Sequence, residues 1–249
     1  MKKVFTFLAI AATLCLVSCK KDNGNKNNQK ENNQEQKQEE EQQSGPAITI
    51  DGQFDDWTAL ATVVAKNNDD SPWDAVKEIR VYADPDFVFY YIKYDKEIVK
   101  DLLAETEEEL PIRLCINTDG EFTSGYEKYF LQSYDFIIEG SLAGEGAFVE
   151  YAGTLFQRVD GSWNELLPVT SGIVIGKGAG NEYEIMLARE LFNNAVPAGM
   201  KMGDVFHTGI RFYYNGGGSW EELSNMPNSS IDDGDGNGWG NLLEVTTTK

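Results

Sequence analysis

Ile48-Thr49-Ile50-Asp51-Gly52-Gln53-Phe54-Asp55-Asp56-Trp57 is the stretch that decides the fold. Its opening alternates apolar and polar residues, which is typical of a strand with one buried face. Asp51-Gly52 then predicts a turn, because Gly tolerates positive φ and Asp can bond the following backbone. Phe54 and Trp57 are three residues apart, so a short helical turn would place both on one side. We expect these residues to close one end of a barrel or sandwich built by the strands that follow.

The first nineteen residues have the features of a bacterial lipoprotein signal. Residues 1–18 combine a basic start with an apolar run that is too short to span a bilayer comfortably. Leu16-Val17-Ser18-Cys19 resembles the lipobox, in which Cys19 becomes the acylated first residue of the mature protein. An ordinary signal with a stray Cys is the alternative. The predicted location is extracytoplasmic, held by lipid chains in the cell envelope, at the outer membrane, with no segment through the bilayer.

A polar segment separates Cys19 from the domain. Residues 20–43 contain only Lys, Asn, Gln, Glu, Asp and one Gly, so they offer no apolar side chain for a core. This composition predicts a disordered tether, and a charged helix over residues 32–43 would be marginal with nothing to pack against. The predicted organisation is a signal at 1–18, a lipidated Cys and tether at 19–46, and one folded domain at 47–249.

Charge and cysteine content narrow the function classes. The net charge of -20 argues against nucleic acid and against anionic lipid headgroups as ligands, while it leaves many carboxylates for hard cations. Of the three cysteines, Cys15 leaves with the signal and Cys19 takes the lipid. Cys115 then remains alone in an apolar run, which excludes a disulfide framework in a monomer and predicts a buried, inert thiol.

From residue 76 onward the chain reads as short strands separated by turns. About ten strands with one or two short peripheral helices predict an all-β fold, an antiparallel β-sandwich or flattened barrel. A helix is expected over residues 96–110. The predicted strands are Val76–Ala83, Phe87–Tyr94, Pro111–Asn117, Tyr134–Glu139, Gly146–Arg158, Thr170–Gly176, Glu182–Ala188, Asp204–Tyr214 and Asn241–Thr247.

An ordered set of short motifs resembles the family 9 carbohydrate-binding module group, part of the wider DOMON-like β-sandwich class. The set covers residue 47 to about residue 245, and each piece alone is weak. The resemblance implies a sandwich that binds a ligand, and sugar is the ligand in this group, although the class also includes haem binders. The matching pieces are Ile50-Asp51-Gly52, Asp55-Asp56-Trp57, Phe89-Tyr90-Tyr91-Ile92, Asn117-Thr118-Asp119-Gly120, Ser124-Gly125-Tyr126, Tyr134-Asp135-Phe136, Tyr183-Glu184-Ile185, Arg189-Glu190-Leu191-Phe192 and Trp239-Gly240.

Two acidic loops are candidate calcium sites. In the first, Asn117, Asp119 and Glu121 place oxygen atoms at alternate positions around Gly120, as loops that wrap Ca²⁺ do. The resemblance associates this region with bound calcium and points to Asp119, although the family more often has Asp at the position of Asn117. An Asx-stabilised turn without metal is the alternative.

The second loop fits the spacing of an EF-hand, although its context does not. Pro227 and strand-like residues 242–247 stand where the two helices of an EF-hand should be. A calcium-binding loop, or only a Gly-Asp-rich loop, is therefore expected ahead of the last strand. The oxygen donors that fit the spacing are Asp233, Asp235 and Asn237, with Glu244 at the final position.

Aromatic residues on loops are the candidate sugar contacts. Sugars pack their C–H faces on indole rings, while their hydroxyls need polar partners. Trp57 and Trp239 lie within the fold motifs and are assigned to the core. Trp73, Trp163 and Trp220 follow polar or Gly-containing residues, so they are the predicted platforms. Trp73 and Trp220 form the preferred pair, with Arg211 and Asn215 as polar neighbours, and the alternative is that these rings only cover the sandwich.

No constellation for catalysis is apparent. No pair of carboxylates is singled out for glycoside hydrolysis, and His207 is the single His, without a G-x-S-x-G elbow. The sequence therefore predicts a non-catalytic, carbohydrate-binding lipoprotein with structural Ca²⁺, a poly- or oligosaccharide ligand, and glycan-uptake or hydrolase proteins as partners. One alternative is an assembly subunit without its own sugar site. Another is haem binding through His207 and one of Met186, Met200 or Met202.

Overall fold

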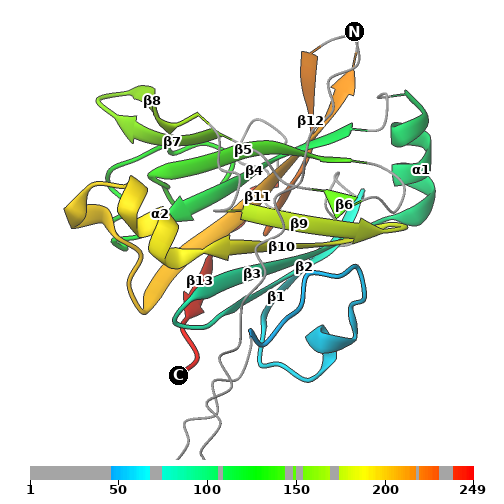
Figure 1. Cartoon of the computed structure of the whole chain (residues 1–249). Helices are drawn as coiled ribbons and strands as arrows, with labels where there is room; N and C mark the ends of the chain where they lie inside the picture. Colours follow the sequence, from blue (N-terminus) through cyan, green and yellow to red (C-terminus); the bar gives the residue numbers. More distant parts are fainter. Residues whose placement is uncertain are drawn as a thin grey trace, which may run out of the picture. The chain divides into compact units, whose positions relative to one another are not determined.

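The computed structural model describes residues 46–67, 75–105, 109–143, 148–149, 154–168, 174–216, 219–229 and 238–249. These residues fold into two antiparallel sheets that face each other, so the predicted all-β sandwich is confirmed (Figure 1). Residues 1–45, which include Cys19 and the tether, lie outside the described part. Within the described ranges, no helix combines the length and the apolar character that crossing a bilayer requires.

One sheet has six strands in the order β1-β2-β3-β10-β9-β6. The central strands β2, β3 and β10 have the bounds that the alternation of apolar residues predicts. The strands in spatial order are β1 (Val63–Lys66), β2 (Val76–Ala83), β3 (Phe87–Tyr94), β10 (Glu182–Ala188), β9 (Val174–Ala179) and β6 (Phe148–Val149).

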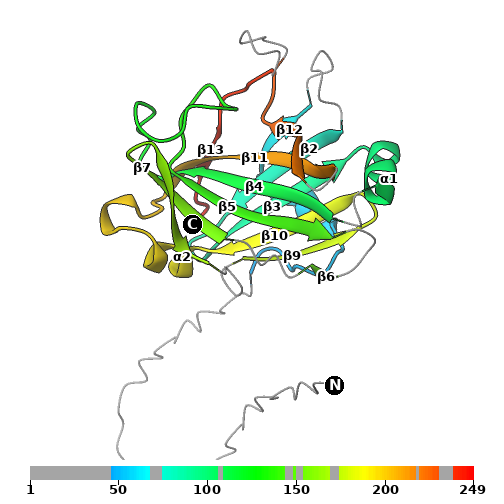
Figure 2. The same ribbon diagram turned by 90° about the horizontal axis from the view of Figure 1, so that it is seen from above.

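The other sheet has seven strands. Six of them follow the order β12-β11-β4-β5-β7-β8, and β13 pairs with β11 on the same side as β12. Figure 1 shows this sheet above the six-stranded sheet, and in Figure 2 the strands of the two layers cross at an angle. Its strands are β12 (Ser219–Met226), β11 (Val205–Gly216), β4 (Glu109–Asn117), β5 (Phe136–Ala143), β7 (Thr154–Val159), β8 (Ser162–Leu167) and β13 (Leu243–Thr246).

The main core fills the space between the sheets. Alternate residues of each strand point inward, as a period of two requires. In β3, for example, Val88, Tyr90 and Ile92 belong to this core, whereas Phe89 and Tyr91 lie on the outer face. Helices α1 (Lys96–Glu105) and α2 (Arg189–Ala195) lie at opposite ends of the sandwich in both views (Figures 1 and 2).

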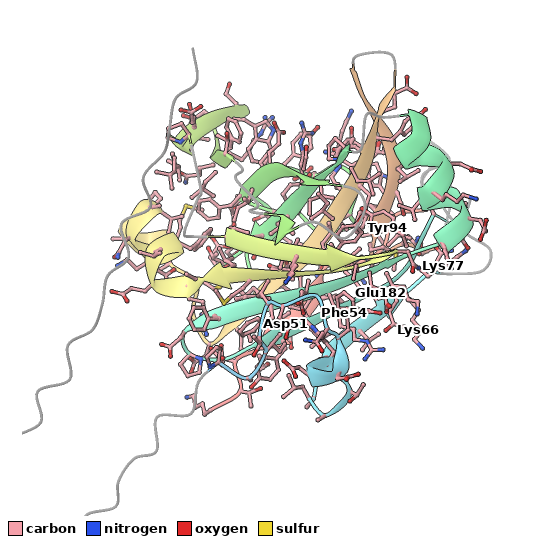
Figure 3. All side chains as sticks on the ribbon, turned by 45° about the vertical axis from the view of Figure 1, so that its right-hand side comes forward. Asp51, Phe54, Lys66, Lys77, Tyr94 and Glu182 are labelled. Carbon is pink, nitrogen blue, oxygen red and sulfur yellow. The ribbon has the colours of Figure 1, made fainter. Side chains whose placement is uncertain are left out.

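The stretch at residues 48–57 does not form the expected strand, and it does not close an end of the sandwich. It crosses the outer face of the six-stranded sheet, where Ile48 and Trp57 pack on Tyr82, Phe89 and Tyr91. Figure 3 shows Asp51 and Phe54 on this side of the sheet, away from the seven-stranded layer. The predicted helical turn is present as η1 (Asp55–Thr58), and Gly52 takes the predicted positive φ of 76°.

Several boundaries differ from the sequence-based expectation. The predicted strand at 146–158 is two strands, because β6 pairs with β9 in one sheet and β7 pairs with β5 in the other. Strands β1, β8 and β12 were not predicted, because β1 is only four residues long and charged or polar residues interrupt the apolar alternation in β8 and β12. The helix predicted to reach residue 110 ends at Glu105, and β4 begins at Glu109.

Candidate functional site

An aromatic layer covers the outer face of the seven-stranded sheet. Cys115 of β4 and Ile137 of β5 point away from the main core, because their neighbours along each strand point into it. The connection between these strands, residues 118–135, folds back over them and is called the β4–β5 loop below. Its Phe130 and Tyr134 are buried against Cys115, Ile137 and Leu242. The loop is therefore fixed to the sheet by packed rings.

A pocket of about 430 Å³ opens in this layer and is called the Trp239 pocket below. One side of it comes from the β4–β5 loop, and the other comes from the segment that precedes β13. Its apolar walls are Phe122, Phe130, Leu131 and Trp239, and its polar lining residues are Glu127, Gln132 and Ser133.

The floor of the pocket rests directly on β11. Gly209 lies under Phe130, and a Cβ at Gly209 would come within 2.6 Å of the Phe130 ring and 3.0 Å of the Leu242 side chain. Real Cβ atoms do not approach that closely, so only glycine lets the ring sit this low. Because Gly209 has no side chain, the Phe130 ring can lie close to β11, and this sets the depth of the pocket.

Three side-chain polar atoms of residues that line the pocket lack a hydrogen-bond partner within the part of the chain that the structure describes. They are Gln132 Oε1, Ser133 Oγ and Trp239 Nε1, and all three are buried. A buried polar group without a partner costs about 1–3 kcal/mol, so such groups are rare unless a ligand or water satisfies them. Glu127 adds one exposed carboxylate at the rim.

The assignment of Trp239 to the core is wrong, because the side chain is half-buried and lines the pocket. Its backbone is nevertheless fixed. Ser229 donates to Gly238 O from its N–H and to Trp239 O from its hydroxyl, both at 2.7 Å. The Leu131 N–H donates to Gly240 O at 3.0 Å, which ties this segment to the β4–β5 loop. The indole is therefore held in place by its own backbone.

Arg211, predicted as a polar neighbour of the ligand, lies behind the pocket. Its guanidinium carbon is 3.2 Å from the centre of the Tyr129 ring, and its Nη2 is 3.2 Å from Glu222 Oε1. The Tyr129 ring is 5.9 Å from the Trp239 ring, so one aromatic ring separates Arg211 from the pocket wall. Tyr129 has a φ of 78°, which is unusual for a residue with a side chain and costs about 1–2 kcal/mol.

A second arginine continues this cluster across the same sheet. Arg113 Nε contacts Glu139 Oε2 at 2.6 Å, and Arg113 Nη1 donates to the Tyr213 hydroxyl at 3.1 Å. Each arginine has a glutamate partner, and burial raises the pKa of Glu222 while Arg211 opposes that rise. The cluster is thus balanced in charge, and its rings and guanidinium groups stiffen the sheet beside the pocket.

The other predicted platform residues have different surroundings. Trp163 of β8 is half-buried, and its ring stacks on Tyr134 at 6.1 Å and meets Tyr126 edge-on at 5.5 Å, so it belongs to the aromatic layer. Asn215 of β11 and Trp220 of β12 lie directly opposite each other in the sheet, and the structure describes their backbone but not their side chains. Trp73 also lies outside the described residues. The predicted pair Trp73 and Trp220 thus stays a prediction.

His207 and the three methionines are not brought together. His207 Nε2 is 3.4 Å from Glu244 Oε2, and its ring meets Phe122 edge-on at 4.9 Å on the outer face of the seven-stranded sheet. Met202 belongs to the core between the sheets, and Met200 packs against that core. Met186 packs on the outer face of the other sheet. These positions do not form the axial pair that the haem alternative needs.

The first acidic loop is held by its own side chains, as the Asx-turn alternative predicts. Asn117 is fully buried, accepts the Gly120 N–H at 2.8 Å, and donates to Glu121 O and Ser133 O at 3.0 and 3.2 Å. Asp119 Oδ1 accepts the Glu121 N–H at 2.9 Å. The carboxylates of Asp119 and Glu121 are exposed. Asp233, Asp235 and Asn237 of the second loop lie outside the described residues.

Sequence reasoning missed Asp135, which lies beneath the first acidic loop. Asp135 is only 2% exposed, and its Oδ2 has no hydrogen-bond partner among the described residues. Burial, and to a smaller extent the nearby charge of Asp119, raise the pKa of its carboxyl to about 6, although a hydrogen bond from the Thr118 N–H opposes the rise. The signal in the sequence was an acidic residue at the edge of an apolar strand, between Tyr134 and Phe136.

Comparison with known proteins does not assign the chain to a family. No protein-family model and no curated protein matches the sequence. The resemblance to the family 9 carbohydrate-binding modules therefore stays a prediction from short motifs, and the function has to be argued from the site itself.

Proposed function

We propose that the domain binds carbohydrate, without cleaving it, in the Trp239 pocket. The observation that carries this proposal is an indole wall beside three buried polar atoms that have no partner among the described residues. Sugars present flat C–H faces that pack on aromatic rings, and they carry hydroxyl groups that need hydrogen bonds. The pocket is lined by both aromatic and polar residues, and its volume is typical of small-molecule sites, which span about 300–1,000 Å³.

Sugar hydroxyl groups can form the hydrogen bonds that the three unpaired atoms need. Trp239 Nε1 can only donate, Gln132 Oε1 can only accept, and the Ser133 hydroxyl can do both. A sugar hydroxyl is also both donor and acceptor, so it suits all three groups in chemistry, and because the three atoms are buried, pairing requires their side chains to turn toward the sugar as it enters. A purely apolar ligand would leave them unpaired at a cost of about 1–3 kcal/mol for each.

A binding role accounts for the pocket better than hydrolysis does. Most glycosidases place two carboxyl groups on either side of the scissile bond. Among the described residues that line the pocket, Glu127 is the one carboxylate, and it lies exposed at the rim. In the proposed setting, a lipid on Cys19 holds the domain at the cell envelope, where it presents poly- or oligosaccharide to glycan-uptake or hydrolase proteins.

The test is retention of glycans by the purified full-length protein on an array of neutral, amino and acidic saccharides. Trp239→Ala should weaken binding of the retained glycan at least about tenfold, because such an anchor contributes at least about 1.4 kcal/mol. Trp239→Phe, which keeps a ring and loses the N–H donor, should fall between wild type and Trp239→Ala. Leu191→Ala, an exposed position on α2, is the matched control and should bind like wild type.

Two outcomes would overturn the proposal. Wild-type protein that retains no glycan would favour the assembly-subunit alternative. Equal retention by wild type, Trp239→Ala and Phe122→Ala, with melting temperatures that show all three to be folded, would place the sugar elsewhere. Trp73 and Trp220 would then be the next positions to replace.

A further inference from the structure

The Trp239 pocket has one charged group in its lining. Glu127 is the single charged side chain among the described residues that line the pocket, and none of those residues is Lys, Arg or His. The Glu127 carboxylate is exposed, and no described residue pairs with it. Lys128, the next residue in the chain, is exposed and does not belong to the described lining. An unpaired carboxylate at the rim of a pocket complements a positively charged group on a ligand.

Two side chains that can carry positive charge stand behind the walls of the pocket, and each faces a glutamate. Arg211 contacts Glu222 at 3.2 Å. His207 packs edge-on against Phe122, with 4.9 Å between the ring centres, and its Nε2 is 3.4 Å from Glu244 Oε2. Both groups are therefore already matched by a carboxylate, and neither is left to bind an acidic sugar.

The charge of the whole chain acts in the same direction as Glu127. The chain has 41 acidic and 21 basic residues, which gives a net charge of -20. A field of this sign repels acidic saccharides and raises the local concentration of cationic ones. Both the local and the overall charge thus favour a ligand with a positive group.

The aromatic lining suits the same kind of ligand. Trp239 and Phe122 are half-buried in the lining, and Phe130 lies beneath them at the floor. A cation within about 6 Å of an aromatic ring centre is attracted to its face, most strongly for Trp. A neutral sugar would use the rings and could donate a hydroxyl to Glu127, but it would leave the charge of that carboxylate unmatched.

We propose that the Trp239 pocket selects amino sugars, and that Glu127 is the residue that determines this selectivity. The inference rests on the proposed carbohydrate function and names its ligand class. The ammonium group of the sugar lies against the Glu127 carboxylate and the Trp239 ring, and the remaining hydroxyls of the sugar meet the polar lining. An N-acetylated sugar lacks the charge and a uronic acid carries the opposite one, so both should bind more weakly.

The experiment compares three tetramers with the same backbone by calorimetry on the full-length protein. The probes are β-1,4-linked glucosamine, N-acetylglucosamine and glucose, which differ only in the group at C2. Galactosamine, N-acetylgalactosamine and galactose form a second set, so that the result does not depend on one backbone. At about pH 5.5, amines are protonated and most carboxylates are ionised. The amine should bind at least about fivefold more tightly than its neutral counterpart, because the ion pair and the cation–ring contact each contribute a factor of about two to five.

Glu127→Gln removes the charge and keeps the size of the side chain and a hydrogen-bond acceptor. It should weaken binding of the amine at least about threefold and change binding of the neutral sugar by less than about 1.5-fold. Glu121→Gln is the matched control, because Glu121 is an exposed carboxylate of the same β4–β5 loop that does not belong to the described lining. It should leave both affinities close to those of wild type. Raising the salt concentration from about 20 to about 300 mM should weaken binding of the amine alone.

The outcomes separate this inference from the proposed function. Equal affinity for amine and neutral sugar, or tightest binding of the acetamide, overturns the selectivity and leaves carbohydrate binding in place. Equal losses in Glu127→Gln and Glu121→Gln, with melting temperatures that show both to be folded, overturn the role of Glu127, because the field of the domain alone would then explain the preference. Absence of binding to all six probes overturns the inference, while the glycan array independently decides whether the domain binds carbohydrate.

Discussion

The indole N–H of Trp57 donates to Glu184 Oε2 at 3.3 Å, and this contact joins the start of the domain to the middle of the six-stranded sheet. The same carboxylate accepts the N–H groups of Asp51 and Gly52 through Oε1, both at 2.7 Å. Glu184 is fully buried on β10. One acidic side chain thus fixes the turn and the helical turn that together cover the outer face of this sheet.

Glu184→Gln should lower the free energy of unfolding by about 1–3 kcal/mol, because its amide nitrogen would face a donor where a carboxylate oxygen now accepts. Burial raises the pKa of Glu184 despite its three hydrogen bonds. The stabilisation from this group is therefore greatest below its unfolded pKa and declines as pH rises through the folded pKa. Urea unfolding at about pH 4 and about pH 7 should show a larger difference between wild type and variant at the lower pH.

Asp56→Asn is the control for this prediction. Asp56 Oδ2 accepts the Thr49 N–H at 3.0 Å in an exposed setting, and an asparagine oxygen can do the same. The change should alter stability by less than about 0.5 kcal/mol. Similar losses in both variants would mean that the fold of residues 48–57 depends on its surface charge and not on Glu184.

Gly209→Ala should damage the Trp239 pocket without touching its lining residues. The added methyl would overlap Phe130 and Leu242, and the ring would have to rise into the pocket. Overpacking of this kind costs about 1–3 kcal/mol. We expect a lower melting temperature and weaker glycan retention, both measured on the full-length protein.

Gly199→Ala is the matched control, because nothing lies within 4 Å of the added methyl. It should leave stability and glycan retention close to those of wild type. Unchanged retention in Gly209→Ala, in a protein shown to be folded, would contradict the placement of the sugar above Phe130.

Arg211→Lys tests whether the arginine cluster supports the pocket. The variant keeps the positive charge, but it loses the flat guanidinium that stacks on Tyr129 and reaches Glu222. A desolvated contact of this type contributes up to about 2 kcal/mol, so unfolding should become easier by about 1–2 kcal/mol. Because Tyr129 packs beside Trp239, glycan affinity should fall as well.

Arg158→Lys provides the comparison, since the Arg158 guanidinium lies 4.9 Å from the Tyr126 ring and is only half-buried. Its effect on stability should be well below that of Arg211→Lys. Equal effects on glycan affinity would show that the aromatic layer as a whole, and not the Tyr129–Arg211 stack, positions Trp239.

The sequence predicted the layers of the fold because alternation reports burial within a single strand. The bounds of β2, β3 and β10 follow directly from their apolar residues. Alternation does not report what covers the outer face of a sheet, so the stretch at 48–57 was assigned to an end of the sandwich. The carboxylate that holds it lies about 130 residues later in the chain, as the separation of Trp57 and Glu184 shows.

The surroundings of the residues at the Trp239 pocket were predicted less well than the fold for the same reason. Arg211 was identified by residue type, yet its position behind Tyr129 depends on how a loop folds over β11. Trp239 was placed in the core because it lies within a fold motif, and motifs do not reveal on which side a ring is exposed. Asp135 carries no recognisable spacing, and its significance comes only from an oxygen left without a partner.

Cysteine reactivity tests both the packing of Cys115 and the lipid on Cys19. Burial raises the pKa of the Cys115 thiol to about 12, so almost no thiolate exists at neutral pH. A thiol reagent such as DTNB should therefore react very slowly with native protein. The sequence predicts that Cys15 is removed with the signal and that Cys19 carries the lipid, so protein purified from membranes should release one equivalent in denaturant. Two equivalents would contradict the lipidation of Cys19, and fast reaction of the native protein at Cys115 would contradict the packing of the aromatic layer over β4.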